Sequence, residues 1–148
     1  MTALVTPFHN GEVAWDTFDR LVDRQIAGGT SWLVPCGTTG ESPTLTDSEH
    51  DRMIEAAIQR AGGRVRVMAG TGSNCTAEAI RRTQRAASIG ANAALVVAPY
   101  YNRPTAEGLY RHFAAIAESA DIPIVLYNVP VRTGVNISND VVERLRNA

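Results

Sequence analysis

The sequence contains no lysine, because all fourteen of its Lys and Arg residues are arginines. Arginine cannot offer the neutral amine that imine chemistry needs, since its guanidinium stays protonated up to a pKa above about 12. Cysteine is scarce, and Cys36 and Cys75 are too few for a disulfide framework, so we expect two free thiols. With His9, His50 and His112 these cysteines show no metal-ligand spacing, and we expect neither a metal nor a cofactor.

Long apolar runs and an excess of one charge are also missing. The net charge is −1 at pH 7 with both signs scattered along the chain, which argues against a nucleic-acid surface or a polybasic membrane anchor. No apolar run approaches the roughly 20 residues of a membrane span, and no signal-type segment opens the sequence. We therefore predict a cytoplasmic protein. Its length suits one domain but is short for the roughly 250 residues of an eight-unit α/β barrel.

Short apolar runs rich in β-forming residues recur along the chain. They begin at positions 3, 32, 65, 94 and 124, so their onsets lie 29, 33, 29 and 30 residues apart. Each interval leaves room for one strand, one helix and two loops. The predicted strands are Ala3–Val5, Trp32–Val34, Val65–Ala69, Ala94–Ala98 and Ile124–Tyr127.

Amphipathic stretches with a period near 3.6 residues lie between these runs and predict helices. Thr46 and Glu49 have the spacing of a capping box at the start of the second helix. We expect Asn74, Thr105 and Ser138 to cap the third, fourth and fifth helices. Glycine pairs end the first two helices. Strands and helices therefore alternate along the chain in units of similar length.

Apolar strands that alternate with amphipathic helices predict a parallel sheet covered by helices. A doubly wound open sheet and a (βα)₈ TIM barrel both fit this α/β pattern. The glycine-rich loop of a flavodoxin-like or dinucleotide-binding domain is missing after the first strand, where Thr6–His9 stands instead. The even repeat and the unusual strand ends favour the barrel. Five such units are fewer than the eight of a complete barrel.

The strand ends carry hydroxyls and glycines that would share one rim of a barrel. Gly37–Gly40 places two threonines between two glycines, which suits a small carboxylate. Tyr101 and Tyr127 offer hydroxyls for a proton relay, but a pKa near 10 requires a basic partner such as an amine on a covalent intermediate. Arg132 suits a bidentate carboxylate clamp. Taken singly, the tyrosines also fit ordinary half-buried aromatics and Arg132 a solvated loop charge.

Three segments resemble the signature segments of the dihydrodipicolinate synthase (4-hydroxy-tetrahydrodipicolinate synthase) family: Gly37–Glu41, Pro99–Pro104 and Tyr127–Gly134. The resemblance runs along the whole chain. It implies a (βα)₈ barrel followed by a small helical segment, usually a homotetramer. Residues 1–148 would then be the N-terminal portion of this single barrel domain, with about its first five units. It also implies condensation of pyruvate with aspartate 4-semialdehyde through a lysine Schiff base, in the diaminopimelate pathway to lysine. Related enzymes such as N-acetylneuraminate lyase share the fold and the Schiff base, but Arg132 favours the synthase.

The resemblance also implies roles for single residues. Tyr127 would donate and accept the proton beside the Schiff base, and Thr38 would connect it to Tyr101, which reaches into the site of a neighbouring subunit. Thr39 would hold the pyruvate carboxylate through its hydroxyl and backbone amide, and Arg132 would bind the carboxylate of the aldehyde substrate. Gly37 is the third implied substrate-binding residue.

Lysine-inhibited members of the family bind lysine as a feedback inhibitor at a subunit interface. The matching positions here are Ser42, His50, Asn74, Glu78 and Tyr100. Asp47 stands where some members carry a histidine, and a polar helix face with satisfied side chains remains the alternative reading.

This sequence departs from the family mainly because it lacks the lysine nucleophile. The family's Schiff-base lysine lies on the sixth strand, beyond the Tyr127 segment, whereas the present sequence reaches Ala148 without any lysine. We therefore predict that this polypeptide alone is inactive and that it is a fragment of a longer enzyme. The alternative is a non-catalytic, five-unit carboxylate-binding protein that uses Thr39 and Arg132.

Overall fold

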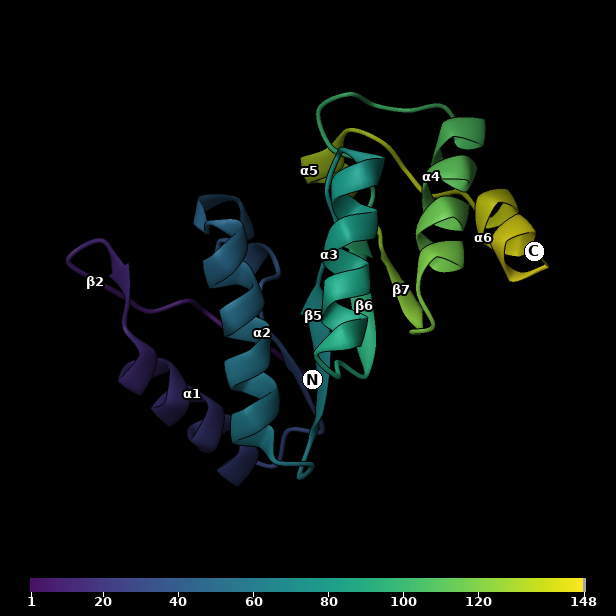
Figure 1. The fold of residues 1–148 in the computed structure, drawn as a ribbon. Coiled ribbons are helices and arrows are strands. Elements are labelled where there is room, and N and C mark those ends of the chain that lie inside the picture. Colours follow the sequence, from purple (N-terminus) through teal and green to yellow (C-terminus); the bar gives the residue numbers. More distant parts are fainter. Residues whose placement is uncertain (148) are drawn as a thin grey trace.

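A five-stranded parallel sheet forms the centre of the protein, whose computed structural model describes residues 1–147 (Figure 1). The strand order β1-β4-β5-β6-β7 follows the chain, so β1 and β7 are the edges of the sheet. All four neighbouring pairs are parallel, and the carboxyl ends of the strands therefore meet at one edge. The strands are β1 (Thr2–Ala3), β4 (Trp32–Val34), β5 (Arg66–Gly70), β6 (Ala93–Val97) and β7 (Ile124–Tyr127).

The predicted runs match these strands, with the second and fifth predicted at their observed bounds. The first run was placed too late, since β1 ends at Ala3. Its partner strand β4 ends at Val34, and the chain turns at Cys36, whose φ is 57°. The Leu4 amide donates to the Val34 carbonyl at 3.0 Å. Because β4 ends at Val34, the residues after Leu4 have no partner strand, and β1 ends early.

Helices follow the strands, and three of the six α-helices in residues 1–147 begin where a side chain caps them. The capping box of Thr46 and Glu49 is confirmed, and so are the caps at Thr105 and Ser138. The cap predicted at Asn74 is wrong, because the third helix begins after Cys75, whose amide donates to the Ser73 hydroxyl at 3.1 Å. The helices are α1 (Trp15–Ala27), α2 (Asp47–Ala61), α3 (Thr76–Ser88), α4 (Ala106–Ser119), α5 (Pro130–Thr133) and α6 (Asn139–Arg146).

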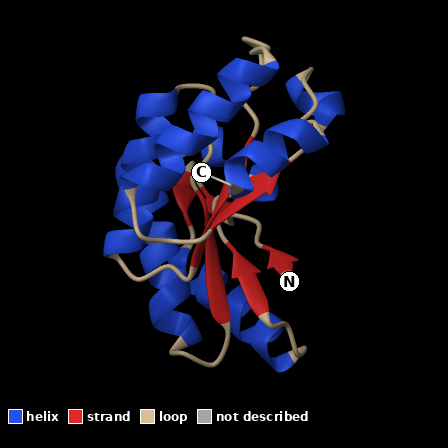
Figure 2. Ribbon diagram, turned by 90° about the vertical axis from the view of Figure 1, so that its right-hand side faces the viewer, coloured by secondary structure: helices blue, strands red, loops and turns tan. Residues whose placement is uncertain are grey.

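Apolar side chains join the helices to one face of the sheet. Phe18 and Met53 bring α1 and α2 against Leu33 of β4, and all three side chains are fully buried. Phe113 of α4 packs in a second cluster with Val96 of β6. Complete burial of one such side chain stabilises the fold by about 1.5–3 kcal/mol. These helices stack along one side of the strands (Figure 2).

The opposite face of the sheet carries a separate small cluster. Its buried members are Val34, Met68 and Ala93, and Trp32 and Leu95 pack beside them. All of these residues belong to the strands themselves. The side chains that face away from the helices therefore form an apolar floor, and the cavity described below lies at the end of this floor.

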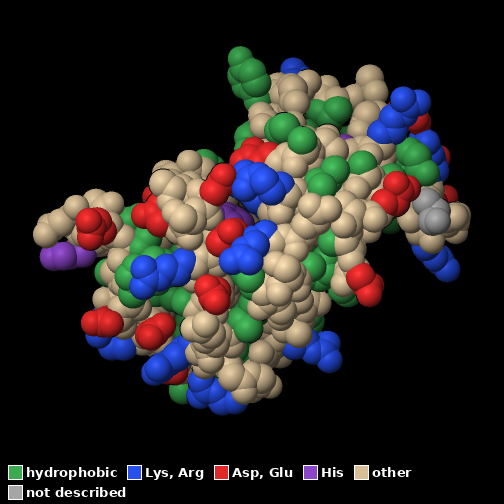
Figure 3. Space-filling view, viewed as in Figure 1, with side chains coloured by type: hydrophobic (Ala, Val, Ile, Leu, Met, Phe, Trp, Pro, Cys, Tyr) green, Lys and Arg blue, Asp and Glu red, His purple; other side chains and the backbone are tan. Residues whose placement is uncertain are grey.

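Short elements that the strand repeat did not predict occupy the loops. A hairpin of β2 (Phe8–His9) and β3 (Glu12–Val13) turns at Asn10-Gly11, where both residues have positive φ. Two 3₁₀ helices, η1 (Thr38–Gly40) and η2 (Ser42–Thr44), follow β4. Within residues 1–147 no helix is long and apolar enough to cross a membrane. Charges of both signs mix over the helical face, notably where α2 meets α3 (Figure 3).

Candidate active site

A cavity of about 620 Å³ opens at the carboxyl ends of the strands. Gly37 and Thr38 enter it from the end of β4, and Gly72 from the end of β5. Tyr100 follows β6, and Tyr127 is the last residue of β7. Four consecutive strands thus contribute to one concave site, which is where parallel α/β folds bind their ligands.

The loop after β4 is a tight turn that hydrogen bonds hold in place. Its 3₁₀ helix η1 is held by Thr6, whose buried hydroxyl donates to the Gly40 carbonyl at 2.7 Å. Cys36 and Glu41 flank the loop with φ values of 57° and 54°, a left-handed conformation that costs energy in residues other than glycine. Thr38 therefore lines the cavity from a loop whose backbone is held at both ends.

Buried polar groups of His50 and Cys36 pack against this loop on the side of α2. His50 of α2 places Nε2 2.8 Å from the Gly70 carbonyl, so Nε2 is the protonated nitrogen in this contact. Burial lowers the pKa of His50, and the imidazole is neutral at pH 7. The Cys36 thiol contacts the His50 carbonyl at 3.6 Å, and burial raises its pKa to about 12. Cys36 is thus an inert thiol in the packing beneath the loop.

Gly70 is required for this arrangement. A Cβ atom at Gly70 would lie 2.2 Å from the Cys36 carbonyl oxygen, far inside van der Waals contact. The Gly70 amide also donates to the Pro35 carbonyl at 3.0 Å. The end of β5 therefore approaches the loop after β4 more closely than any side chain allows.

The loop after β7 carries Arg132, which lines the cavity from the opposite side. Asn128 closes this loop by donating to the Asn136 side chain at 2.8 Å and accepting from the Ile137 amide at 3.1 Å. The buried Thr133 hydroxyl donates to the Val135 carbonyl at 2.9 Å. These contacts hold the short helix α5 and with it the backbone of Arg132.

The predicted site residues divide into two groups in this chain. Those that line the cavity are Gly37, Thr38, Ser42, Glu78, Tyr100, Tyr127 and Arg132. Thr39, His50, Asn74 and Tyr101 are not among its lining residues. Tyr101 is 91% exposed, with a φ of 72°, and its side chain extends from the rim into solvent.

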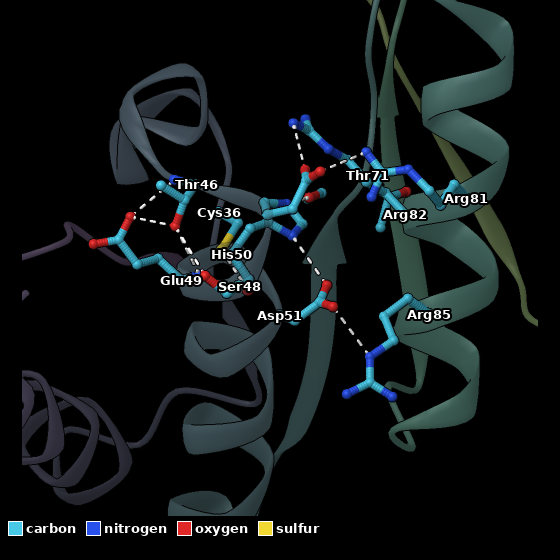
Figure 4. A network of polar contacts seen from close by, with 12 residues as sticks. Cys36, Thr46, Ser48, Glu49, His50, Asp51, Thr71, Arg81, Arg82 and Arg85 are labelled. Atoms are coloured by element: carbon cyan, nitrogen blue, oxygen red, sulfur yellow. Dashed lines mark hydrogen bonds and ion pairs between the residues drawn. The ribbon is translucent and has the colours of Figure 1, made fainter.

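A network of ion pairs runs from α2 to α3 beside the cavity (Figure 4). Asp47 of α2 contacts Arg81 at 2.9 Å and Arg82 at 3.7 Å. Arg82 also contacts Glu78 at 2.6 Å and lines the cavity with it. Sequence reasoning missed Arg82, although the four-residue spacing of Glu78 and Arg82 on a helix is the signal of such a pair.

Part of the cavity wall is apolar. Leu95 and Val97 of β6 form its floor, and Pro43 and Val129 reach it from the loops. Among residues 1–147 no group of histidine, cysteine, aspartate and glutamate side chains is arranged to hold a metal ion. The site therefore offers hydroxyls, backbone amides and the guanidiniums of Arg82 and Arg132 around an apolar floor, together with the carboxylates of Glu41 and Glu78. Hydroxyls, amides and guanidiniums are the groups that bind a small organic anion.

Comparison with known proteins gives this site its context. The sequence profile of the Dihydrodipicolinate synthetase family matches residues 1–148. The 4-hydroxy-tetrahydrodipicolinate synthase of Phenylobacterium zucineum is 59% identical over 145 residues, 98% of this chain and 49% of that protein. The crystal structure of dihydrodipicolinate synthase from Aquifex aeolicus matches with a TM-score of 0.97 at 51% identity, covering 99% of this chain and 50% of that one. The chain spans about half the length of the relatives it matches.

Two further solved structures contain a ligand. Dihydrodipicolinate synthase from Acinetobacter baumannii, complexed with pyruvate, matches with a TM-score of 0.94 at 51% identity, covering 97% of this chain and 50% of that one. The DHDPS of Cyanidioschyzon merolae, with lysine bound, matches with a TM-score of 0.95 at 41% identity, covering 98% of this chain and 50% of that one.

Proposed function

Since the chain belongs to the dihydrodipicolinate synthetase family, we propose that it supplies the N-terminal half of a 4-hydroxy-tetrahydrodipicolinate synthase, a lyase of lysine biosynthesis. The reaction condenses pyruvate with L-aspartate 4-semialdehyde. The observation that carries this proposal is the convergence of Thr38, Tyr127 and Arg132 on one cavity. Among pyruvate-dependent aldolases, the guanidinium of Arg132 favours a second substrate with a carboxylate of its own.

The sheet corresponds, in this proposal, to the first five units of an eight-unit barrel. The TM-score of 0.97 over half of the Aquifex aeolicus chain supports this assignment. So does the sheet itself, in which strand order equals chain order and β1 and β7 remain as edges. The remaining units would pair with these edges and cover the apolar strand face that carries Met68.

The cavity residues take the following parts in the reaction. A lysine amine attacks the C2 carbonyl of pyruvate, water leaves, and the resulting imine loses a methyl proton to become the carbon nucleophile. The Tyr127 hydroxyl passes these protons, and Thr38 continues the relay toward Tyr101. Because Tyr101 is largely exposed in a single copy, its hydroxyl serves a neighbouring subunit of a homotetramer.

Substrate carboxylates bind at the two ends of the cavity. Thr39 holds the pyruvate carboxylate through its hydroxyl and backbone amide, beside Gly37, although only Gly37 of the two lines the cavity in this chain. Arg132, on the opposite loop, holds the carboxylate of the aldehyde.

The nucleophile must come from outside residues 1–148, because they contain no lysine. We infer that the chain alone does not form the imine. Arginine does not replace the missing amine, since it stays protonated up to a pKa above about 12. In this proposal residues 1–148 bind and orient the keto acid, and the second half of the enzyme supplies the amine that forms the covalent bond.

A lysine effector pocket is the second proposed feature of this site. Ser42, Glu78 and Tyr100 line the cavity, and His50 is buried behind the loop after β4. The Asn74 carbonyl accepts a hydrogen bond from the Asn102 side chain at 3.1 Å, which ties it to the loop that carries Tyr100. The lysine bound to the Cyanidioschyzon merolae relative supports such a pocket.

A chimera tests the proposal directly. The matching residues of the Phenylobacterium zucineum synthase are replaced by this chain, and consumption of pyruvate with aspartate 4-semialdehyde is measured. We expect an active chimera in which Tyr127→Phe lowers kcat by about 100-fold or more, the usual size of a lost proton transfer. Tyr110→Phe is the matched control, because Tyr110 lies on α4 under Arg144 and does not line the cavity. A folded but inactive chimera, or a fully active Tyr127→Phe variant, would refute the assignment.

A further inference from the structure

The loop after β6 contains two residues other than glycine with a left-handed backbone, Tyr101 with a φ of 72° and Arg103 with a φ of 47°. The Asn102 amide donates to the Tyr100 carbonyl at 2.9 Å, which closes a γ-turn around Tyr101. A γ-turn with positive φ is rare and strained, and such strain persists only where surrounding contacts impose it. The shape of this loop therefore depends on the contacts that it makes with its neighbours.

Two consecutive side chains of this loop contact the loops on either side of it. The Asn102 side chain donates to the Asn74 carbonyl at 3.1 Å, in the loop after β5. Arg103 Nε donates to the Gly134 carbonyl at 3.3 Å, at the end of α5 in the loop after β7. The loop after β6, which runs beside α5 in Figure 1, thus joins the ends of three neighbouring strands.

Arg103 packs along the Gly134 backbone as well as bonding to it. A Cβ atom at Gly134 would lie 3.3 Å from Arg103 Nε and 3.5 Å from its Cδ and Cγ, so the arginine side chain lies where a side chain of residue 134 would extend. Gly134 is the C-cap of α5, and arginine side chains commonly bond to the free carbonyls at a helix C-terminus. Arg103 thus caps the short helix that carries Arg132.

The contact between Arg103 and Gly134 is exposed to solvent. An exposed hydrogen bond contributes little to the stability of a fold, because water replaces either partner when the bond is lost. The hydrogen bonds of Asn128 and Thr133 lie within the segment 128–137, whereas Arg103 reaches this segment from another loop. The Arg103 bond therefore bears on the position of α5 at the rim more than on global stability.

We propose that Arg103 is a positioning residue that directs Arg132 toward its substrate. This inference rests on the proposed function, in which Arg132 binds the carboxylate of the aldehyde. A guanidinium binds a carboxylate through two parallel hydrogen bonds only when the two groups are aligned, so a small shift of α5 weakens the contact. Pyruvate is bound by the loop after β4, on the opposite side of the cavity. Loss of Arg103 therefore weakens the binding of one substrate and spares the other.

The variant Arg103→Met tests this inference in the chimera with the Phenylobacterium zucineum synthase. Methionine keeps an unbranched aliphatic side chain but has no donor for the Gly134 carbonyl. Steady-state kinetics with each substrate varied in turn give kcat and the two KM values. We expect the KM for aspartate 4-semialdehyde to rise about tenfold, the size of one lost hydrogen bond, while the KM for pyruvate stays within about twofold. The value of kcat should fall by less than about threefold.

Two further variants serve as controls. Arg103→Lys keeps a donor for the same carbonyl and should hold the KM for the aldehyde within about threefold of that of the unmodified chimera. Arg111→Met is the matched arginine control, because Arg111 is 77% exposed on α4, pairs with Glu107 at 2.8 Å and does not line the cavity. It should leave kcat and both KM values unchanged. Circular dichroism checks that each variant folds, and Arg103→Leu replaces an Arg103→Met variant that does not.

Three results in an active chimera would overturn this inference alone. The first is an Arg103→Met variant with both KM values unchanged. The second is a variant in which both KM values rise equally, because that would mean a general loss of order at the rim. The third is an Arg103→Lys variant as impaired as Arg103→Met. By contrast, an unmodified chimera that folds but is inactive would overturn the proposed function, and this inference with it.

Discussion

Acid should destabilise this fold through His112, a histidine that the proposed reaction does not use. Its side chain is 5% exposed between α3 and α4. Nδ1 lies 2.9 Å from the Thr76 hydroxyl, and the edge of the ring contacts Phe113, with ring centroids 5.2 Å apart. Burial lowers the pKa of His112 from 6.5 to about 4, so the folded protein holds the neutral imidazole.

The pKa difference fixes both the sign and the size of the effect. Below pH 6.5 the unfolded chain takes up a proton at this position, whereas the folded chain does so only near pH 4. The free energy of unfolding is therefore full above pH 6.5 and falls as the pH decreases. The whole shift corresponds to about 3 kcal/mol, of which about 2 kcal/mol is lost by pH 5. His50, whose pKa burial also lowers, acts in the same direction.

Urea unfolding between pH 8 and pH 5 measures this loss. We expect His112→Leu to flatten the pH dependence of the free energy of unfolding by about 2 kcal/mol over that range. His9→Gln is the control, since His9 is exposed on the β2–β3 hairpin, and it should keep the original slope. Equal slopes in the unmodified chain and His112→Leu would show that the buried imidazole is not the titrating group.

Three further substitutions test the fold and the site. Thr46→Ala removes the capping box of α2 and should lower the free energy of unfolding by about 1 kcal/mol in urea titrations, and an unchanged midpoint would contradict the cap. Phe113→Ala should cost about 3–5 kcal/mol by the same assay, because the side chain is 1% exposed; a loss near zero would mean that the core is packed differently. Gly70→Ala should displace the loop after β4 and lower kcat/KM of the chimera, because the new Cβ meets the Cys36 carbonyl at 2.2 Å; normal activity would show that the loop moves freely.

The strand and helix repeat could be predicted from the sequence because its signals are local. Buried parallel strands form short apolar runs, and caps such as Thr46 and Ser138 follow from hydrogen-bonding chemistry within one turn. The end of β1 could not be predicted, since it depends on where β4 stops pairing. The β2–β3 hairpin was also missed, because strands of two residues are too short to show alternation, although Asn10-Gly11 is a hairpin signal.

The candidate site could also be predicted only in part from the sequence. Strand-end position predicted that Thr38, Tyr127 and Arg132 would share a rim, and all three line the cavity. Position alone does not give the direction of a side chain. Tyr100 therefore faces the cavity while its neighbour Tyr101, with a φ of 72°, extends into solvent.

The place of Arg82 in the cavity wall was not predicted, for a different reason. On a helix, a charged pair four residues apart is usually a solvated surface pair. In the fold the Arg82 side chain is only 12% exposed, and it lies beside Asp47 of α2, an element distant in sequence. Burial of this kind depends on tertiary packing and leaves no local pattern in the sequence.

NMR spectroscopy of [2-¹³C]pyruvate with the purified chain shows in one spectrum whether the cavity binds the keto acid and whether the keto acid becomes covalently attached. We expect the C2 signal to broaden on binding, Thr38→Val to abolish this broadening, and C2 to remain a free carbonyl throughout. Either an imine resonance at C2 or a pyruvate signal that the chain leaves unchanged would contradict this expectation.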